Sequence, residues 1–285
     1  MPTLYIVATP IGNLEDISLR ALRTLREVKL IAAEDTRKTK RLLNHYDIKT
    51  TMTSYYEHNK LTKLDYLLGC LEMEDVALVS EAGMPGISDP GYELIVAAIQ
   101  RDIPVVPIPG ASVVAAALPV SGLATDRFTW LGFLPRRASD RQQLLQDIAA
   151  DRATIVILEA PHRLLSTLKD MLLVLGDRRI AVCRELTKLH EEVFRGRISQ
   201  CIEHFIGPRG EFTLVVEGRV EKDKPQMTGD IEGQLSEMHQ SGLTAKEAIA
   251  RMTIETGLSR KELYRAWLKV SGSVQESKAR KAERS

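Results

Sequence analysis

The stretch Val76–Gly91, VALVSEAGMPGISDPG, is the most informative part of the chain for its fold. Its first four residues form an apolar run that is typical of a short buried strand and that stops at Ser80. The twelve residues from Ser80 onward contain three Gly and two Pro, which favours a tight loop at the carboxyl end of a strand. Such a loop can present backbone groups to a ligand. The alternative is a stiff connection to a helix that begins near Gly91.

Apolar runs like this one recur through the first 120 residues, with helical patterns between them. This alternation predicts an α/β domain with a parallel sheet that is covered by helices on both faces. A ligand of such a sheet binds at the carboxyl ends of the strands. The expected strands are 4–8, 30–33, 51–54, 76–79 and 105–108, and the loops at the proposed binding edge are 10–13, 34–37, 81–90 and 109–112.

A polar, turn-rich segment at 120–127 predicts a boundary between a first domain, 1–120, and a second domain, 121–220. Fewer helices separate the strands of the second domain, so we expect a mixed or antiparallel sheet there. Ser139 and Gln142 have the spacing of a capping box at the start of a helix. The expected strands are 128–134, 154–158, 179–184, 191–196 and 211–216.

A charged stretch at 217–230 predicts a linker, and a small helical domain over 231–285 follows it. Two capping boxes, Thr244–Glu247 and Ser259–Glu262, indicate a pair of helices with a helix-turn-helix shape. The second helix and a basic tail at 278–284 combine aromatic and basic side chains, which favours RNA contacts. The candidate RNA-binding residues there are Arg260, Lys261 and Arg265. The alternative is an amphipathic helical cap in which Trp267 faces a core.

Composition limits the class of protein. The chain has 285 residues, 44% of them hydrophobic and 27% charged, with a net charge of +1, which is ordinary for a globular protein and excludes binding of nucleic acid over the whole surface. Its three cysteines are scattered, so we expect a reducing cytoplasm and no disulfide framework. A Cys201–His204 pair is better explained by core packing, and no metal site is expected. No apolar run of membrane-spanning length occurs, so no membrane association is expected.

Known phosphate-binding motifs are missing from the strand-end loops. Neither a dinucleotide fingerprint nor a P-loop follows any expected strand. The loops at 10–13, 81–90 and 109–112 contain no Lys or Arg. This pattern favours a ligand that has no phosphates and is held by backbone groups and apolar contacts.

Seven ordered motifs resemble those of the ribosomal RNA small subunit methyltransferase I family, within the tetrapyrrole methylase superfamily. The resemblance extends over nearly the whole chain. The motifs are LYIVATPIGNLEDI at 4–17, AEDTR at 33–37, SEAGMPGISDPG at 80–91, PGAS at 109–112, GFLP at 132–135, PHR at 161–163 and RELTK at 184–188.

This resemblance implies a two-domain tetrapyrrole-methylase-like fold, the class III methyltransferase fold, with the small C-terminal helical domain added to it. It also implies a homodimer that binds S-adenosylmethionine between its two α/β domains. By similarity, the reaction is 2′-O-methylation of a cytidine in the decoding region of small-subunit (16S) rRNA, with the rRNA or the 30S subunit as the partner. The positions implied for the cofactor are Pro10, Ala82, Gly83, Met84, Ile87, Ser112, Val113, Glu159 and Leu186.

The resemblance also implies an acidic catalytic base at the end of the second strand. Glu34 is the first candidate and Asp35 the second. The alternative for each is that it caps the next helix or pairs with Arg37. Arg37, Arg136, Arg137 and Arg163 are candidates to hold RNA phosphates, with surface charge as the alternative.

Two other functions stay open at this point. One is a small-molecule tetrapyrrole (porphyrin or precorrin) methylase, and the other is a nucleic-acid-binding regulator whose α/β part only senses S-adenosylmethionine. Tetrapyrrole methylases carry Asp where this chain has Asn13 and Met84. These departures argue against a porphyrin-type substrate.

Overall fold

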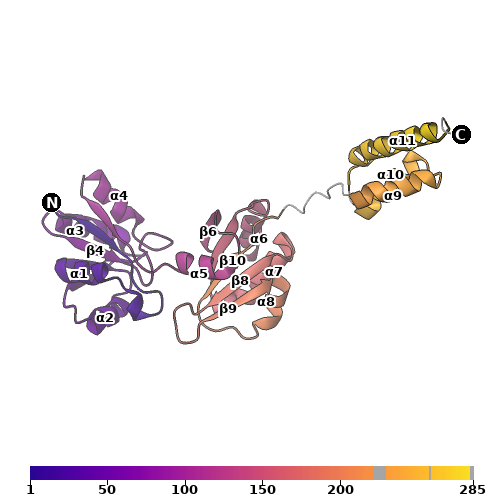
Figure 1. Ribbon diagram of the computed structural model, residues 1–285. Coiled ribbons are helices and arrows are strands. Elements are labelled where there is room, and N and C mark those ends of the chain that lie inside the picture. The colour runs from indigo at the N-terminus through magenta and orange to yellow at the C-terminus, as the bar shows by residue number, and fades with distance from the viewer. Residues whose placement is uncertain (221–228, 257, 283–285) are drawn as a thin grey trace. The chain divides into compact units, whose positions relative to one another are not determined.

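The computed structural model describes residues 1–220, 229–256 and 258–282, the last range with side chains as far as Ser271 (Figure 1). Its contacts divide the chain into two compact units, Met1–Arg219 and Val220–Ser285. The first unit contains both sheets, and the second is helical. Among the described helices, none combines the length and the apolar character that crossing a membrane requires.

The first sheet has the order β3-β2-β4-β1-β5, and all of its strand pairs are parallel. This confirms the predicted parallel α/β architecture. The central strands alternate between two cores, because successive side chains of a strand point to opposite faces. The strands are β1 (Leu4–Val7), β2 (Leu30–Ala33), β3 (Thr51–Ser54), β4 (Val76–Val79) and β5 (Val105–Ile108).

Helices cover both faces of this sheet, as Figure 1 shows. Helices α1 (Leu19–Glu27) and α2 (Thr36–His45) bury leucines against one face, whereas α3 (Lys60–Leu71) and α4 (Tyr92–Gln100) bury theirs against the other. A short 3-10 turn at Leu14–Asp16 precedes α1, and the hydroxyl of Ser18 accepts the capping hydrogen bond from the Ala21 amide at 3.1 Å.

The second sheet has the order β6-β7-β10-β8-β9. Only the β6–β7 pair is parallel, so the sheet is mixed, which agrees with the prediction. Its strands are β6 (Phe128–Phe133), β7 (Thr154–Glu159), β8 (Arg179–Arg184), β9 (Glu192–Arg197) and β10 (Phe212–Val216). Since β8 and β7 both run antiparallel to β10, they run in the same direction as each other.

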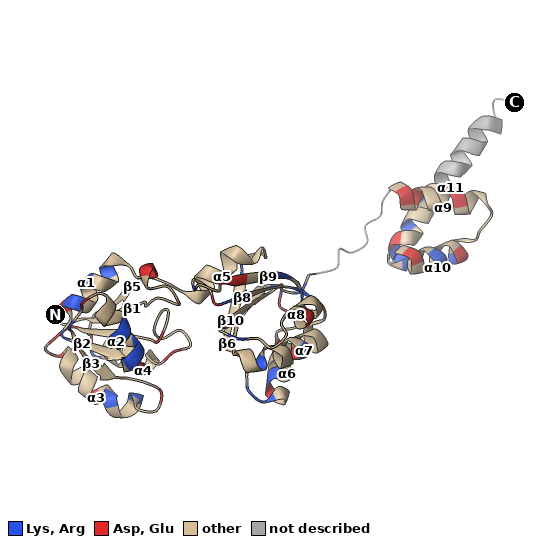
Figure 2. Cartoon of the chain, turned by 90° about the horizontal axis from the view of Figure 1, so that it is seen from below, with Lys and Arg blue, Asp and Glu red and all other residues tan. Residues whose placement is uncertain are grey.

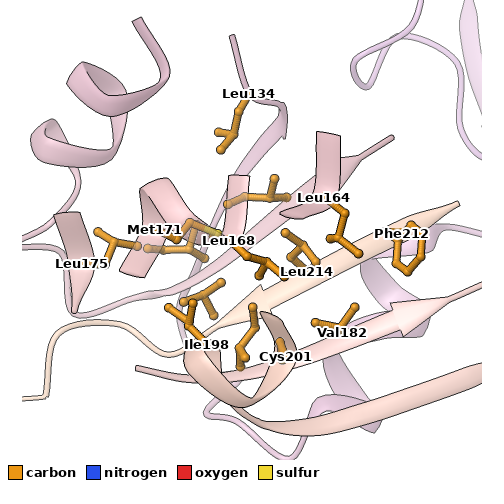
Figure 3. Packing of buried hydrophobic residues seen from close by; sticks show 14 of the residues in the cluster. Leu134, Leu164, Leu168, Met171, Leu175, Val182, Ile198, Cys201, Phe212 and Leu214 are labelled. Carbon is orange, nitrogen blue, oxygen red and sulfur yellow. The ribbon is translucent and has the colours of Figure 1, made fainter. Parts of the chain in front are cut away.

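A hydrophobic core covers one face of the second sheet (Figure 3). In this core, leucines of the helix Leu164–Leu175 pack with strand residues such as Val182 and Leu214. The helices on this face are α6 (Ala138–Asp147), α7 (Leu164–Leu175, preceded by a 3-10 turn at Pro161–Arg163) and α8 (Ile198–His204). Ile198 and Cys201 of α8 lie fully buried in this core, and His204 pairs with Glu192 at 2.7 Å. Cys201 therefore belongs to core packing, whereas His204 lies at the surface.

The other face carries α5 (Val113–Ser121), whose Ala117 and Leu118 pack against Val156 and Ala181. The sequence places this helix at the end of the first domain, but its packing places it with the second sheet. Its apolar residues lack a clear stripe, so its sequence pattern does not indicate which sheet it contacts.

The predicted capping box of α6 is wrong. Arg137 precedes the helix, and no side chain caps it. The Ser139 hydroxyl instead contacts Asp140, and the amide of Gln142 donates to Asp170 at 2.7 Å. Asp170 also pairs with the buried Arg141, so tertiary contacts outcompete the local motif.

The described residues of the helical unit form three helices, α9 (Gly229–Gln240), α10 (Ala245–Thr256) and α11 (Arg260–Ala282). The sequence predicts only the last two, and α9 begins inside the stretch assigned to a linker. Trp267 is 6% exposed and packs in the core of the unit, with its ring 5.1 Å from that of His239. Trp267 thus has the core position that the alternative interpretation describes. The side chains of the predicted basic tail, 278–284, lie outside the described residues.

Both capping boxes of this unit are confirmed. The Thr244 hydroxyl donates to Glu247 at 2.7 Å, and the Ser259 hydroxyl donates to Glu262 at 2.6 Å. In each box, the backbone N–H of each residue also donates to the side chain of the other residue.

We expect Thr244→Ala to destabilise the helical unit by about 1 kcal/mol, because an N-cap hydroxyl contributes that much on average. Chemical denaturation of the full chain, followed by far-UV circular dichroism, would measure the change. Thr253→Ala is the control, because the Thr253 hydroxyl bonds to a carbonyl inside α10 and caps nothing. An equal loss in both variants would contradict a capping role for Thr244.

Candidate active site

Two strand-end loops of the first sheet are joined by backbone hydrogen bonds. Thr9, after β1, and Gly83, after β4, exchange two bonds of 2.9 Å each. The Gly83 backbone has φ +80°, which a residue without a side chain adopts at little cost. These bonds hold the loop after Val79 in the position predicted for a pocket wall.

The loop after β1 also contacts the second sheet. The backbone N–H of Asn13 donates to the Thr187 hydroxyl at 3.0 Å. A Cβ atom on Gly12 would lie within 3 Å of three atoms of 186–188, so only Gly permits this approach. Thr187 has φ +68° and Glu185 has φ +51°, an uncommon conformation for both residue types. Strained backbone is frequent at functional sites, which draws attention to this segment.

A second contact joins the β4–α4 loop to β6. The indole of Trp130 donates to the Ser88 hydroxyl at 3.0 Å. A Cβ atom on Gly132 would lie 2.8 Å from that same oxygen. Residues far apart in the sequence thereby form one continuous wall.

A cavity of about 490 Å³ lies between these walls, a volume suited to a small-molecule cofactor. Five carboxylates line it, and Lys, Arg and His are absent from its described lining. The acidic residues are Glu34, Glu81, Asp89, Glu159 and Glu211, and the others are Ile11, Ala82, Gly83, Met84, Ile87, Ser88, Ser112, Val113, Val114, Trp130, Phe133, Leu158, Ala160, Pro161, Phe212 and Thr213. An acidic, partly apolar cavity favours a cationic ligand that carries no phosphate.

The structure brings most of the implied cofactor positions to this cavity. Those that line it are Ala82, Gly83, Met84, Ile87, Ser112, Val113 and Glu159. Pro10 and Leu186 do not line it. Pro10 precedes the lining residue Ile11, and the Leu186 carbonyl faces Gly12 across the contact between the β1 loop and the second sheet.

Glu34 extends from the end of β2 into the cavity. Its Oε2 accepts a hydrogen bond of 2.9 Å from the Glu81 amide. Burial raises the pKa of Glu34 above its usual value, the positive charge of Lys38 lowers it and the negative charge of Asp35 raises it. A carboxyl group with a raised pKa holds protons more strongly than an exposed one, as a proton acceptor in catalysis requires.

Asp35 has a different position. Its Oδ1 accepts hydrogen bonds from the amides of Arg37 at 2.8 Å and Lys38 at 3.3 Å, so it caps α2. These backbone hydrogen bonds, the Arg37 amide first, lower the pKa of Asp35. Asp35 is absent from the cavity lining, and capping accounts for its conformation. Of the two candidates, Glu34 is the one that lines the cavity.

Asp89 is a second acidic group with an altered pKa. Burial raises the pKa of Asp89 to about 6, the negative charge of Glu34 adds to the rise, and a hydrogen bond with the Ser80 side chain opposes it. Mutual repulsion between carboxylates in one cavity has this effect, and a bound cation would relieve it.

Glu159 and Arg163 lie mostly inside the second domain. Glu159 accepts a hydrogen bond of 2.5 Å from the Thr167 hydroxyl and pairs with Arg163 at 3.3 Å. The Arg163 guanidinium also donates to the Leu134 carbonyl at 2.8 Å, and its side chain is 14% exposed. Because these contacts occupy its charge, Arg163 has a structural position and does not suit the predicted phosphate contact.

The other predicted RNA contacts are exposed. Arg136 and Arg137 follow β6, and Arg37 is at the start of α2, whose ribbon is largely blue in Figure 2. The first six residues of α2 include four basic ones, Arg37, Lys38, Lys40 and Arg41. In the helical unit, the exposed candidates are Arg260, Lys261 and Arg265.

Sequence reasoning missed several parts of this site. Trp130, Phe133 and Glu211 line the cavity, and Thr187 binds the β1 loop. Phe133 and Thr187 lie inside two of the ordered motifs, so those motifs carried a signal that was not used. Glu211 had no such signal, because only the pairing of Phe212 with Glu159 brings it to the cavity.

Comparisons with known proteins agree with this geometry. A family model of tetrapyrrole (corrin/porphyrin) methylases matches residues 3–202. A crystal structure of diphthine synthase has a TM-score of 0.59 at 14% identity and covers 77% of this chain and 91% of its own. A uroporphyrin III C-methyl transferase from Thermus thermophilus has a TM-score of 0.56 at 20% identity and covers 75% of this chain and 97% of its own. The fold is therefore the two-domain fold of the tetrapyrrole methylases.

Curated relatives narrow this class. Proteins named ribosomal RNA small subunit methyltransferase I are 49% identical in Halalkalibacterium halodurans, with 92% of this chain and 93% of the relative covered, and 49% identical in Thermotoga maritima, with 77% and 100% covered. The chain belongs to the ribosomal RNA small subunit methyltransferase I family.

Proposed function

We propose that the protein transfers a methyl group from S-adenosylmethionine to the 2′-hydroxyl of a cytidine in the decoding region of small-subunit rRNA. The observation that carries the proposal is the cavity of about 490 Å³ lined by five carboxylates and by no basic side chain in its described lining. Membership of an rRNA methyltransferase family supplies the substrate class.

The residues of the cavity fit this cofactor. When bound, S-adenosylmethionine supplies a methyl group on a positively charged sulfur. Glu34 and Asp89 attract such a cation, whereas Glu81, Glu159 and Glu211 are already paired with Lys38, Arg163 and Lys188. The backbone of Ala82 and Gly83 can approach the cofactor closely. Met84, Ile87 and Val113 offer apolar contacts, while Ser112 offers a hydroxyl. The implied positions and the charge of the cavity thus favour the same ligand.

Glu34 is the proposed proton acceptor for the ribose hydroxyl. Its Oε2 is fixed by the Glu81 amide, and Glu81 is itself paired with Lys38. Positioning of the two reactants contributes most of the acceleration in such a transfer, and a base at the hydroxyl adds to it. Arg37, Arg136 and Arg137 are the proposed phosphate contacts of unit 1.

A porphyrinoid methylase is the second candidate, because a family model of tetrapyrrole (corrin/porphyrin) methylases matches residues 3–202. The likeness to uroporphyrin III C-methyl transferase, at 20% identity, shows the fold alone. Asn13 and Met84 stand where methylases of that kind carry Asp, and Asn13 uses its side chain to cap a 3-10 turn here. RNA is therefore the better supported substrate.

Incubation with labelled S-adenosylmethionine and either naked small-subunit rRNA or small subunits from a strain that lacks the enzyme tests the function. We expect label on one cytidine ribose. Label on an added porphyrinoid and none on RNA would favour the second candidate. Binding of the cofactor without any transfer would favour a sensor.

A homodimer and a cytoplasmic location complete the proposal. Both are implied by the family, and the scattered positions of the three cysteines in the sequence favour a reducing compartment. Sedimentation equilibrium of the full chain tests the dimer.

The helical unit is proposed to strengthen RNA binding through Arg260, Lys261 and Arg265. The T. maritima relative is matched over its whole length by 77% of this chain, and Met1–Arg219 is 219 of 285 residues, also 77%. A methyltransferase of this family can therefore have about the length of Met1–Arg219 alone.

Truncation after Arg219 is expected to weaken RNA binding several-fold and to leave the cofactor affinity unchanged, because all residues in the described lining of the cavity belong to Met1–Arg219. Filter binding of rRNA and calorimetry with the cofactor measure the two affinities. Truncation after Gly242 is the less suitable change, since it separates α9 from the helices that complete its core. An unchanged RNA affinity would show that the unit has another role.

A further inference from the structure

A second cavity, outside the proposed active site, lies at a corner of the second sheet. Its volume is about 370 Å³, and three arginines line it: Arg179 of β8, and Arg195 and Arg197 of β9. The rest of its lining is Ser121, Gly122, Leu123, Ile180, Gly196 and Gln200. No acidic residue belongs to this described lining, so the cavity has the opposite charge to the active site.

The strand register places these arginines together. Arg179 is directly opposite Arg197 in the antiparallel β8–β9 pair, and Arg195 is opposite Ala181. Residues paired in this way share one face of a sheet, and every second residue of a strand shares that face as well. Like charges directly opposite each other destabilise a sheet. The arrangement therefore has an energetic cost unless an anion offsets it.

Acidic neighbours offset little of this charge. Arg179 pairs with Glu217 at 3.8 Å, and both side chains are partly exposed. Arg197 donates to the Asp177 main-chain carbonyl at 2.6 Å, while the Asp177 carboxylate is bonded to Ser199. Arg195 donates to the Val120 carbonyl at the end of α5. Two of the three guanidinium groups are thus oriented by carbonyl oxygens, which carry no formal charge.

The cavity is far from the active site on the same sheet. Strand β10 runs from Phe212, which lines the active site, to Val216, which is paired with Ile180 of the arginine cavity. Four residues of strand span about 13 Å. An RNA that reaches both ends contacts the sheet well beyond its target nucleotide.

We propose that Arg179, Arg195 and Arg197 bind a backbone phosphate of the substrate RNA away from the methylated nucleotide. Arginine suits this role, because its planar group donates two parallel hydrogen bonds to a phosphate. The site rests on the proposed function and deepens it, since it names a contact that holds the RNA across the second domain.

The test compares Arg179→Gln/Arg197→Gln with Arg20→Gln/Arg23→Gln, in the full chain. The control removes the same charge from exposed positions of α1, in the other α/β domain. Arg195 is kept, because its contact with Val120 also holds α5. Filter binding of naked small-subunit rRNA at several salt concentrations measures affinity, calorimetry measures cofactor binding, and sedimentation measures the oligomeric state.

We expect the cavity variant to lose about tenfold in RNA affinity and to reduce the slope of log affinity against log salt by about one, since the loss of one phosphate contact has an effect of that size. Its cofactor affinity stays that of the wild type, and the control changes less. Equal effects in the two variants, or unchanged RNA affinity with loss of a dimer, would overturn the proposal. If the wild type methylates no RNA, the proposed function fails; if it does and the variant binds RNA normally, only the arginine site fails.

Discussion

Glu34→Gln is expected to slow methyl transfer to RNA by about 10²–10⁴-fold, the usual contribution of a positioned base. The amide keeps the oxygen that accepts the Glu81 N–H, so the loop geometry is preserved. Cofactor affinity should change only a few-fold. Because the pKa of Glu34 is raised, the wild-type rate should increase with pH as the carboxyl group loses its proton. Single-turnover kinetics over a pH series measure both effects.

Asp35→Asn is the matched control for Glu34. Asn also caps helices well, so α2 stays intact and turnover should remain close to that of the wild type. An equal loss in the two variants would mean that both act through the position of α2. Unchanged turnover in Glu34→Gln would remove Glu34 from the mechanism.

Asp89→Asn is expected to weaken S-adenosylmethionine binding about tenfold at pH 8, or ~1.4 kcal/mol, and to have little effect at pH 5. The pKa of Asp89 is about 6, so the wild-type carboxyl group is neutral at the lower pH and negative at the higher one. Only the negative form attracts the cationic cofactor. Isothermal titration calorimetry at both values measures the difference.

The same shift affects stability in a defined direction. The pKa of Asp89 is about 6 in the folded protein and 3.8 as the reference for an unfolded chain. Between these values the folded state binds more protons, so wild-type stability falls as pH rises from about 4 to about 6. The Asp89→Asn variant has no carboxyl group at this position, so its stability does not fall in this way. Its stability relative to the wild type should therefore increase across that window.

A control for Asp89 is Asp102→Asn, at an exposed turn after α4. Its backbone has φ +56°, which Asn tolerates. Cofactor binding of this variant should match that of the wild type at both pH values. A pH-independent loss in Asp89→Asn would instead indicate that the β4–α4 loop had been displaced.

Local patterns predicted the elements of this fold well. The apolar run Val76–Val79 and the Gly/Pro loop after it correctly predicted a strand and the edge of the sheet at which it ends. This succeeded because the spacing of apolar residues and the residues that favour turns are short-range properties of the sequence. The boxes at Thr244 and Ser259 formed for the same reason. The box at Ser139 failed where a buried ion pair between Arg141 and Asp170 competes for its side chains.

Properties that depend on tertiary contacts could not be predicted in this way. The packing of α5 on the second sheet, the burial of Arg163 and the raised pKa of Asp89 all depend on groups distant in sequence. Glu34 and Asp35 are adjacent and of the same chemical type, yet one points into the cavity and the other caps a helix. Only the structure distinguishes these two carboxylates.

The cysteines have a practical consequence for spectroscopy. Cys183 and Cys201 are buried, and burial raises their pKa values to about 11 and about 12, so almost none of either thiol is present as reactive thiolate at neutral pH. Cys70, on α3, is partly exposed. A maleimide fluorophore should therefore attach at Cys70. Because Cys70 is absent from the lining of the active-site cavity, the dye would report on RNA approach by energy transfer without occupying the active site.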